Sequence, residues 1–559
     1  MQVDPDSAGA ALGGADVKTT DRLCTSGLEI AADALGGDGT TLIACGQMSA
    51  LFEDLAEDLG ASGSLVTVDI RDRAGWTADD SATAKQAALL AEATLPIPVT
   101  PARDVVSEGT CLLLGAPHVA LEAAEALSAR LAVTCMLSGA PDDLVPTADY
   151  DIALGRLKSA TGALGGFNVT IDGYRPVEPG GRGAAGFGNP IDGAKSTCDI
   201  IVDLRGEGPL FSADHKREGY LRADPRDPLA MRAILANALE LQGVFEKPLY
   251  VRFEEALCAH SRAGRPGCDR CVTVCPTGAI TSDGDTVVID SDICAGCGAC
   301  AAVCPSGAAS YDDPPVGHLF SRLSTLGSAF RKAGGRAPRA LFHDPEHGGE
   351  MIRLSARFGR GLPADVIPVE VPNVEGVGHA EILAALGVGF SGVAILPGPR
   401  TDLEVPEREL ALAQAILQDD TRVAILDASD PDRLEAALYG TAPEPLASDP
   451  ILPLGGRREV TRNAAASLTA AEVPIPLPEG APYGTVTLDT DACTLCLACV
   501  SLCPVGALGD NPEKPQVRFQ EAACLQCGIC ASACPESAIA LTPQLDLSTT
   551  ALSHRVLHE

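Results

Sequence analysis

The cysteines of this chain are concentrated in four short blocks, and each block ends in Cys-Pro. Three of the blocks share the spacing C-x2-C-x2-C-x3-C-P. They consist of Cys294, Cys297, Cys300 and Cys304; Cys493, Cys496, Cys499 and Cys503; and Cys524, Cys527, Cys530 and Cys534. The remaining block keeps Cys268, Cys271 and Cys275, but Arg265 stands where its leading cysteine belongs, and the nearest substitute is Cys258. No other feature constrains the fold of these segments as strongly.

This spacing is typical of ligands to cubane iron–sulfur clusters. Gaps of two residues let three thiolates from one loop converge on one small cluster, whereas the cysteine before proline ligates the other cluster of a two-cluster ferredoxin. The blocks should therefore work in pairs and hold four [4Fe-4S] clusters. The expected ligand sets are Cys294, Cys297, Cys300 and Cys275; Cys268, Cys271, Cys304 and Cys258; Cys493, Cys496, Cys499 and Cys534; and Cys524, Cys527, Cys530 and Cys503.

Zinc and disulfides are the rival interpretations of cysteine-rich segments. Structural zinc usually takes its ligands as two separated pairs, which differs from three thiolates at two-residue intervals. The first twenty residues carry two acidic side chains before any basic one and lack a continuous apolar stretch, so they do not make a secretory signal. We therefore expect a cytoplasmic protein whose cysteines are reduced. The longest uncharged apolar stretch, residues 382–397, is shorter than the roughly 20 residues that span a bilayer.

Outside the cysteine blocks, short β-branched runs alternate with periodic stretches rich in alanine and leucine. This texture predicts an α/β fold: Rossmann-like or flavodoxin-like α/β domains with two inserted bacterial-type 2[4Fe-4S] ferredoxin modules of α+β structure. The expected units are N-terminal α/β domains (1–245), a first ferredoxin module (246–314), a central α/β domain (315–445), a linker (446–482), a second ferredoxin module (483–545) and a C-terminal tail (546–559).

Two of these regions carry more specific patterns. In the central block, strand-like runs at 339–344, 364–371, 392–398 and 422–428 alternate with three amphipathic stretches. They predict a small doubly wound parallel sheet, with a crevice at the strand ends that could bind a nucleotide or a partner's loop. After Cys275 and after Cys503, two short strand-like runs flank a turn, which predicts a hairpin in each module.

The net charge of the chain indicates which class of partner it can bind. The chain has 75 acidic and 41 basic residues, a formal net charge of −34. Binding to nucleic acid depends on lysine and arginine contacts with phosphates, so a nucleic-acid partner is not expected. An acidic surface favours a basic docking face on a protein partner, although it also fits a generally acidic proteome.

One stretch of the first module resembles a known family. Leu257 to Arg262 reads LCAHSR, the C-x2-C of Cys268 follows, and residues 292–308 read DICAGCGACAAVCPSGA. This combination resembles large multi-cluster 4Fe-4S binding proteins that bacteria encode beside formate dehydrogenases, and the likeness runs from about Thr40 to the second module. The resemblance implies that Cys258 takes the missing ligand position and that formate dehydrogenase is a candidate partner.

The resemblance also has gaps. Members of that family often carry a further cysteine run after an Asn-Pro that corresponds to residues 189–190, whereas only Cys198 is present here. The central block is distantly similar to the δ-type subunit that connects hydrogenases to heterodisulfide reductases. It lacks that subunit's cysteines, which implies a docking or scaffolding role.

The leading hypothesis is an electron-transfer protein that carries electrons through its clusters between a redox enzyme and an acceptor, with no catalytic residue of its own. One alternative is a catalytic oxidoreductase subunit with a flavin or nicotinamide in an α/β domain. A second is a metalloenzyme assembly factor, which would need a reactive cysteine outside the blocks. We expect those five cysteines to pack as small apolar residues. They are Cys24, Cys45, Cys111, Cys135 and Cys198.

Overall fold

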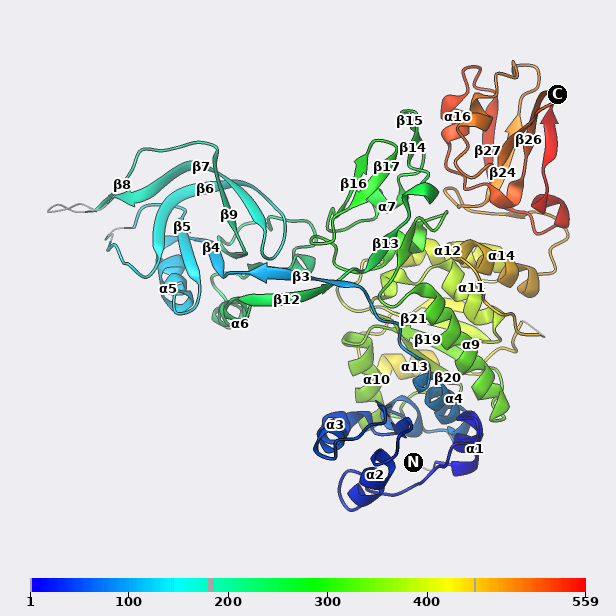
Figure 1. Cartoon of the computed structure of the whole chain (residues 1–559), viewed down its shortest axis with the longest axis horizontal. Helices are drawn as coiled ribbons and strands as arrows, with labels where there is room; N and C mark the ends of the chain where they lie inside the picture. The colour runs from blue at the N-terminus through cyan, green and yellow to red at the C-terminus, as the bar shows by residue number, and fades with distance from the viewer. Residues whose placement is uncertain (1–2, 142, 144, 179–184, 447–448) are drawn as a thin grey trace.

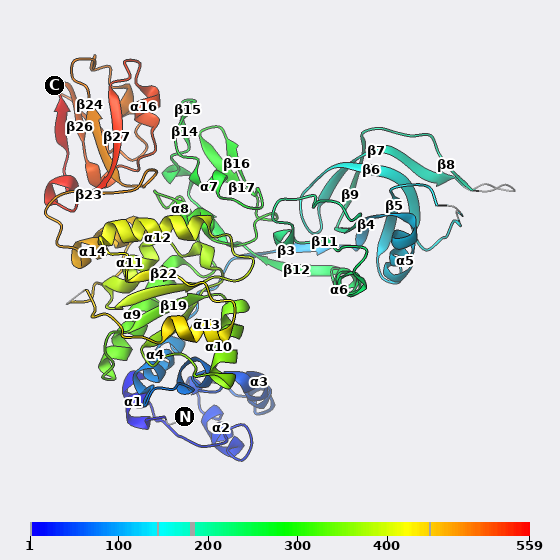
Figure 2. The ribbon, with the colours of Figure 1, turned by 180° about the vertical axis from the view of Figure 1, so that it is seen from behind.

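The computed structural model describes residues 3–141, 143, 145–178, 185–446 and 449–559 and shows a mixed helix and strand fold. Figure 1 shows a central body with the N-terminal helices on one side, a domain that projects away from it, and two small modules on the side opposite the N-terminal helices. The view from behind shows the same arrangement, with the two modules next to each other (Figure 2).

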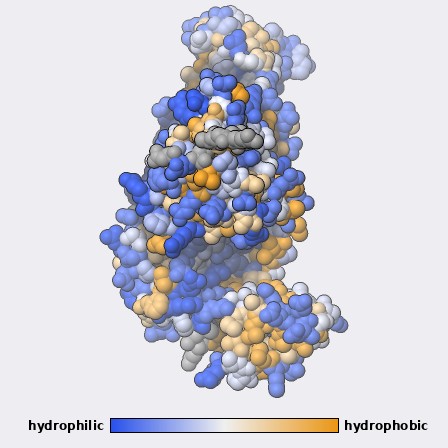
Figure 3. Space-filling model, turned by 90° about the vertical axis from the view of Figure 1, so that its left-hand side faces the viewer, coloured by the Kyte–Doolittle hydropathy of each residue, from blue (hydrophilic) through white to orange (hydrophobic). Residues whose placement is uncertain are grey.

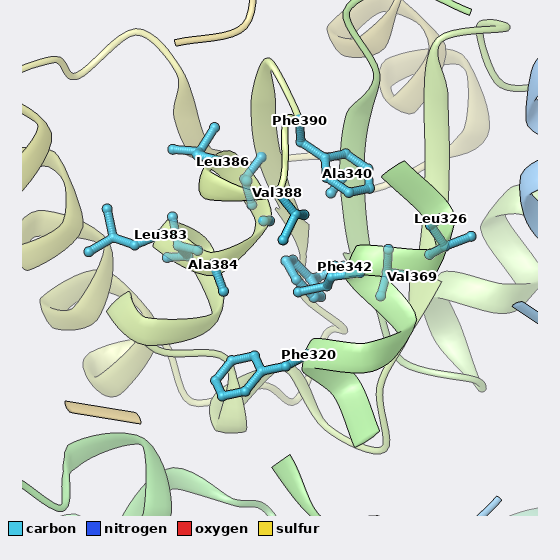
Figure 4. Packing of buried hydrophobic residues seen from close by; sticks show 14 of the residues in the cluster. Phe320, Leu326, Ala340, Phe342, Val369, Leu383, Ala384, Leu386, Val388 and Phe390 are labelled. Carbon is cyan, nitrogen blue, oxygen red and sulfur yellow. The ribbon is translucent and has the colours of Figure 1, made fainter. Parts of the chain in front are cut away.

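The central body is built on a four-stranded parallel sheet in the order β20-β19-β21-β22. Side chains alternate across this sheet. Phe342 packs with α9 and α11 (Figure 4). Leu341 packs with α10 and α13 on the opposite face. The strands fall within the four runs that the sequence predicts. The elements are β19 (Arg339–His343), β20 (Val366–Glu370), β21 (Gly392–Leu396), β22 (Val423–Ile425), α9 (Val316–Lys332), α10 (His347–Phe358), α11 (His379–Gly387), α12 (Glu404–Leu417), α13 (Pro431–Leu438) and α14 (Arg457–Leu468).

The first part of the chain packs on this central body. Ile70 and Leu89 share one hydrophobic core with Phe320 of α9, although about 230 to 250 residues of sequence separate them from it. The predicted unit 1–245 thus covers two separately packed regions, this one and the projecting domain. The elements here are α1 (Pro5–Ala11), α2 (Leu28–Leu35), β1 (Thr41–Ile43), α3 (Ser49–Asp58), β2 (Leu65–Thr67) and α4 (Thr83–Ala93).

The projecting domain contains an eight-stranded mixed sheet. Its main path is β11-β10-β4-β5-β6-β7-β8, and β9 pairs with β7. The antiparallel ribbon β3–β12 joins the domain to the rest of the molecule (Figure 1). The elements are β3 (Ala102–Ser107), β4 (Thr110–Gly115), α5 (Pro117–Leu127), β5 (Ala132–Leu137), β6 (Asp151–Thr161), β7 (Phe167–Glu178), β8 (Gly186–Phe187), β9 (Ala194–Cys198), β10 (Ile200–Leu204), β11 (Tyr220–Arg222), α6 (Pro228–Leu239) and β12 (Gly243–Pro248).

The two modules share one plan, in which an outer strand pair and an inner hairpin enclose two short helices. The interior module pairs β13 with β18 and β16 with β17, and the C-terminal module pairs β24 with β27 and β25 with β26. Both hairpins predicted from the sequence are present. The interior elements are β13 (Val251–Phe253), β14 (Ser261–Arg262), β15 (Arg265–Pro266), α7 (Arg270–Thr273), β16 (Ile280–Asp283), β17 (Thr286–Ile289), α8 (Ala299–Val303) and β18 (Ala309–Tyr311). The C-terminal elements are β23 (Ile475–Pro476), β24 (Gly484–Leu488), α15 (Ala498–Ser501), β25 (Leu508–Asn511), β26 (Lys514–Phe519), α16 (Ile529–Ala533), β27 (Ile539–Leu545) and β28 (Arg555–His558).

Among the residues that the structure describes, no helix combines the length and the apolar character that a bilayer span requires.

Candidate metal centres

Every cysteine block begins at the same distance from the strand before it. The strands β13, β17, β24 and β26 end at Phe253, Ile289, Leu488 and Phe519, and a cysteine follows five residues after each end, at Cys258, Cys294, Cys493 and Cys524. Cys258 therefore occupies the place that the leading cysteine holds in the three regular blocks. The structural position thus supports the ligand role that the family resemblance implies for Cys258.

The extra residues of the irregular block lie between Cys258 and Cys268 and form the small hairpin β14–β15. The backbone N–H of Gly267 donates to the carbonyl of His260 at 2.8 Å, and that of Cys268 donates to the carbonyl of Ala259 at 2.9 Å. These bonds bring Cys268 beside the residue that follows Cys258. The insertion thus leaves both thiols available to one site.

The sixteen block cysteines form four groups, and each group matches one expected ligand set. Group III lines one cavity and group IV lines another. In the interior module, the charge of Cys271 interacts with the other three thiols of group I, and the charge of Cys300 interacts with those of group II. The groups are I (Cys258, Cys268, Cys271 and Cys304), II (Cys275, Cys294, Cys297 and Cys300), III (Cys493, Cys496, Cys499 and Cys534) and IV (Cys503, Cys524, Cys527 and Cys530).

The cysteine loops have a special backbone that turns N–H groups toward the sulfurs. In the loop of group II, Gly296 and Gly298 have φ angles of 70° and 79°. The residue three positions after the last cysteine of each block also has a positive φ: Gly278, Gly307, Gly506 and Ser537. Behind these turns, backbone N–H groups donate to sulfur, from Ala309 to Cys304 Sγ at 3.3 Å, from Leu508 to Cys503 Sγ at 3.5 Å and from Ala538 to Cys534 Sγ at 3.3 Å.

The chemistry of these groups fits iron–sulfur clusters. Burial raises the pKa of the Cys271 and Cys530 thiols to about 12, so these groups need a bound cation to remain thiolates at neutral pH. Four soft thiolate donors per group are the ligands of cubane clusters, and the cavity of group IV is otherwise lined by apolar residues and glycine. Among the residues that the structure describes, no three His, Cys, Asp or Glu side chains surround a position for a single metal ion.

The two modules meet at a contact between groups I and IV. Arg270 lies between Cys268 and Cys271 in the sequence, and its guanidinium donates to the carbonyls of Gly480 at 3.0 Å and Leu525 at 3.5 Å. Burial raises the pKa of the Cys268 and Cys527 thiols, and the nearby Arg270 opposes this rise at both. Groups I and IV are therefore neighbours, although Cys268 and Cys527 are about 260 residues apart in the sequence.

Residues that precede β13 and loops of the central body surround group II. Tyr250 packs directly on the cluster loop, because a Cβ on Gly296 would lie 2.6 Å from its ring. Lys216, Arg217 and Lys247 line a cavity of about 1140 Å³ together with Tyr250 and Cys297. This cavity lies at the carboxyl ends of β19, β20 and β21, since the loops Asp344–His347, Pro372–Glu375 and Gly398–Thr401 form its other wall.

These basic residues were not found by sequence reasoning. Lys216 and Lys247 belong to the projecting domain and the ribbon that leaves it, and no motif marks them. Three of the five cysteines outside the blocks lie near one another, because the pKa of Cys111 is raised by its burial and, further, by the neighbouring Cys198 and Cys135. Cys111, Cys135 and Cys198 are buried in the cores of the projecting domain, and burial raises the pKa of Cys135 and Cys198 to about 12.

Comparisons with known proteins agree with this geometry. The family model described as "4Fe-4S dicluster domain" matches residues 265–308, and a second model of the same description matches residues 492–539. The second match contains all eight cysteines of its module, whereas the first begins after Cys258. No curated protein matches the chain. The chain thus contains two 4Fe-4S dicluster ferredoxin domains, which indicates an iron–sulfur electron-transfer protein.

Proposed function

We propose that the protein conducts electrons through four [4Fe-4S] clusters, one in each cysteine group. The sixteen ligands are those of groups I to IV, with Cys258 completing group I. The clusters supply reversible one-electron transfer at low potential. The observation that carries this proposal is that the four groups follow one another in space as a single row, II–I–IV–III.

Each step of this row rests on two thiols that lie close enough for the charge of one to raise the pKa of the other. Cys300 of group II interacts with Cys271 of group I. Cys268 of group I interacts with Cys527 of group IV. Cys530 of group IV interacts with Cys499 of group III. The four cysteine groups therefore form one series that continues from the interior module into the C-terminal module.

The chain's own residues hold and insulate this row. The N–H groups of Ala309, Leu508 and Ala538 donate to sulfur, which stabilises negative charge on these thiolates. The inner hairpins supply apolar cover: Val287 and Phe519 are almost fully buried against cysteines of groups I and II and of groups III and IV, respectively. These side chains thereby cover one side of each pair of groups.

We propose a protein redox partner, with formate dehydrogenase as the candidate that the family resemblance suggests, and a cytoplasmic location. The acidic balance of the chain favours a partner with a basic docking face. Hydrophilic side chains cover most of the face shown in Figure 3, on which the projecting domain lies toward the viewer. In this proposal the central body is a scaffold that holds both modules in place.

The second candidate function is the binding of a nucleotide or flavin by the central domain. The cavity at the strand ends favours it. One feature of that cavity argues against a bound nucleotide or flavin. Asp344 Oδ1 accepts the backbone N–H of His347 at 2.6 Å and thereby caps the N-terminus of α10. A carboxylate thus occupies the place where sheets of this kind hold a phosphate. We therefore rank this candidate second.

Anaerobic purification followed by iron and sulfide analysis tests the proposal. We expect about sixteen iron atoms and about sixteen sulfides per chain, with the broad absorbance near 400 nm that such clusters give. About eight would mean that one module holds no clusters, and a colourless protein would overturn the proposal. A yellow extract with flavin fluorescence after acid precipitation would favour the second candidate.

A further inference from the structure

We propose that Arg457 and Arg458, the first two residues of α14, hold the two modules at the spacing at which the clusters of groups I and IV exchange electrons. This inference rests on the proposed function and assigns positioning residues to its central step, the transfer between the modules. Each arginine acts through carbonyl groups of the segments that carry the cysteines. Arg457 contacts the interior module and Arg458 contacts the C-terminal module.

Arg457 ties the interior module to the central body. Its guanidinium donates to the carbonyl of Ala301 at 3.0 Å. Ala301 lies in α8, between Cys300 of group II and Cys304 of group I. Another N–H group of Arg457 donates to Glu381 Oε2 at 2.7 Å, and this carboxylate of α11 is almost fully buried. The ion pair fixes the direction of the guanidinium, so the helix beside group I is held in place.

Arg458 ties the C-terminal module to the same point. Its Nε donates to the carbonyl of Ala522 at 3.0 Å, Nη1 to that of Pro482 at 2.9 Å and Nη2 to that of Cys524 at 2.5 Å. Cys524 is the leading cysteine of group IV. The guanidinium also stacks on Tyr483, 4.6 Å from the centroid of its ring. A guanidinium holds its donors in a rigid fork, so it fixes these carbonyls in one arrangement, whereas a lysine is a flexible point charge.

The two arginines stand at an unfavourable place for the helix itself. Both lie in the first turn of α14, where the helix dipole favours negative rather than positive charge. The helix is nevertheless firmly placed, because Val460 and Ala464 are fully buried in the same hydrophobic core as α11. A fixed helix thus presents two adjacent arginines to the two modules, and the contacts with the modules account for their position.

The segment 480–483, directly before β24, shows how closely the parts meet. Its carbonyls accept N–H groups from Arg270 of the interior module and from Arg458 of α14. The same segment, both arginines and Cys304 of group I line a cavity of only about 40 Å³. This is room for only a few water molecules. The modules therefore have little freedom to move while these contacts are made, and loss of the arginine contacts should create that freedom.

Arg462, one turn further along α14, provides a matched control. Its guanidinium donates to the carbonyl of Asp546 at 2.8 Å, directly after β27. This contact also ties α14 to the C-terminal module, but Asp546 lies outside the cysteine blocks. Loss of Arg462 should therefore weaken the attachment of the module without displacing the loop of group IV. The pair Arg458 and Arg462 separates positioning from stability.

The experiment is EPR of the fully reduced, cluster-loaded full chain, in which neighbouring clusters broaden each other's signals. The broadening that disappears in both Cys258→Ala and Cys527→Ala identifies the interaction between groups I and IV. We expect Arg458→Gln to lose most of this interaction and Arg458→Lys to retain only part of it. The rate at which an electron from photoreduced deazaflavin spreads between the modules should fall in the same variants, because electron transfer slows steeply with distance.

Two further variants complete the comparison. Arg457→Gln is made together with Glu381→Gln, so that no buried carboxylate is left without its cation, and this double variant should weaken the same interaction. Arg462→Gln should leave both the interaction and the rate unchanged. An unchanged interaction or rate in the Arg457 and Arg458 variants, or an equal loss in Arg462→Gln, would overturn the inference.

Iron analysis of each protein separates this inference from the proposed function. With about sixteen iron atoms per chain, the proposed function stands whichever way the interaction responds to the arginine variants. A wild-type protein that takes up no clusters would contradict the proposed function itself. If Arg458→Gln fails to fold, Arg458→Lys and the double variant at Arg457 and Glu381 decide the inference.

Discussion

The interior and C-terminal modules have the same strand plan and eight cysteines each, but their surroundings differ. The interior module lies between the projecting domain and the central body. Tyr250, directly before β13, packs on the loop of group II, and Lys216 of the projecting domain lines the cavity beside it. The C-terminal module leaves Cys496 of group III exposed. The comparison teaches that cysteine spacing specifies which cluster a module can hold, whereas the neighbouring domains set the charge and the access at each cluster.

The largest effect is expected for the iron content of a variant at Cys258, the position at which the two modules differ in cysteine spacing. Cys258→Ala removes the leading ligand of group I, so the chain should lose about a quarter of its iron, one cluster of four. Iron analysis and EPR of the reduced protein measure the loss. Cys24→Ala is the control, since Cys24 lies outside the four groups, and it should retain all its iron. An unchanged iron content in Cys258→Ala would show that group I does not need this ligand.

The next effect concerns how the C-terminal module is held on the central body. His379 of α11 contacts Glu409 of α12 at 2.5 Å and Tyr483 of the C-terminal segment at 2.9 Å. Glu409→Gln removes the partner of a buried, charged histidine and should lower the free energy of unfolding by about 3–5 kcal/mol. Urea unfolding followed by the fluorescence of Trp76 measures this. Asp224→Asn, which removes an exposed ion pair with Arg226, should leave the midpoint unchanged.

The same pair predicts a pH dependence with a definite sign. The contact with Glu409 and the nearby Tyr483 raise the pKa of His379 from 6.5 to about 9 against the effect of its burial. A raised pKa in the folded state means that this contribution is complete below pH 6.5 and is lost as the pH rises through 9. Wild-type stability should therefore fall more steeply than that of Glu409→Gln between these values. Parallel pH profiles of the two proteins would contradict the assignment.

A smaller effect compares the same position in two cluster loops. Gly298 of group II and Gly528 of group IV have φ angles of 79° and 84°. A Cβ on Gly298 would lie 2.9 Å from the Cα of Gly376 in the central body, whereas nothing lies within 4 Å of a Cβ on Gly528. Gly298→Ala should cost roughly 3 kcal/mol and Gly528→Ala roughly 1 kcal/mol, measured by urea unfolding. Equal costs would mean that the interior loop is not enclosed.

The smallest effect on stability, and the most informative about the contact between modules, is expected for Arg270→Gln. The guanidinium ties the interior module to the carbonyls of Gly480 and Leu525. Its loss should preserve the iron content and weaken the magnetic interaction between reduced clusters of groups I and IV, as seen in EPR line widths. Unchanged interaction would show that other contacts, such as Ser532 Oγ to the carbonyl of Pro266, suffice.

The cysteine groups could be predicted from the sequence because ligand spacing is a local property of each loop. The central strands could be predicted because β19 and β21 are short, buried apolar runs. The long hairpin β6–β7 was missed. The strand β6 has mixed exposure and no regular alternation, and the pairing contains two register shifts, although β7 alternates between apolar and polar residues from Phe167 to Ile171. Lys216 and Lys247 were also missed, because their place beside group II depends on how the projecting domain packs, which no local pattern encodes.

A reductive titration of the anaerobically prepared full chain, followed by EPR, tests the central claim most directly. A continuous row of four clusters should take up about four electrons per chain, and the fully reduced protein should show signals broadened by interactions that extend across both modules. Uptake of about two electrons, or a spectrum that equals the sum of two independent modules, would contradict the row.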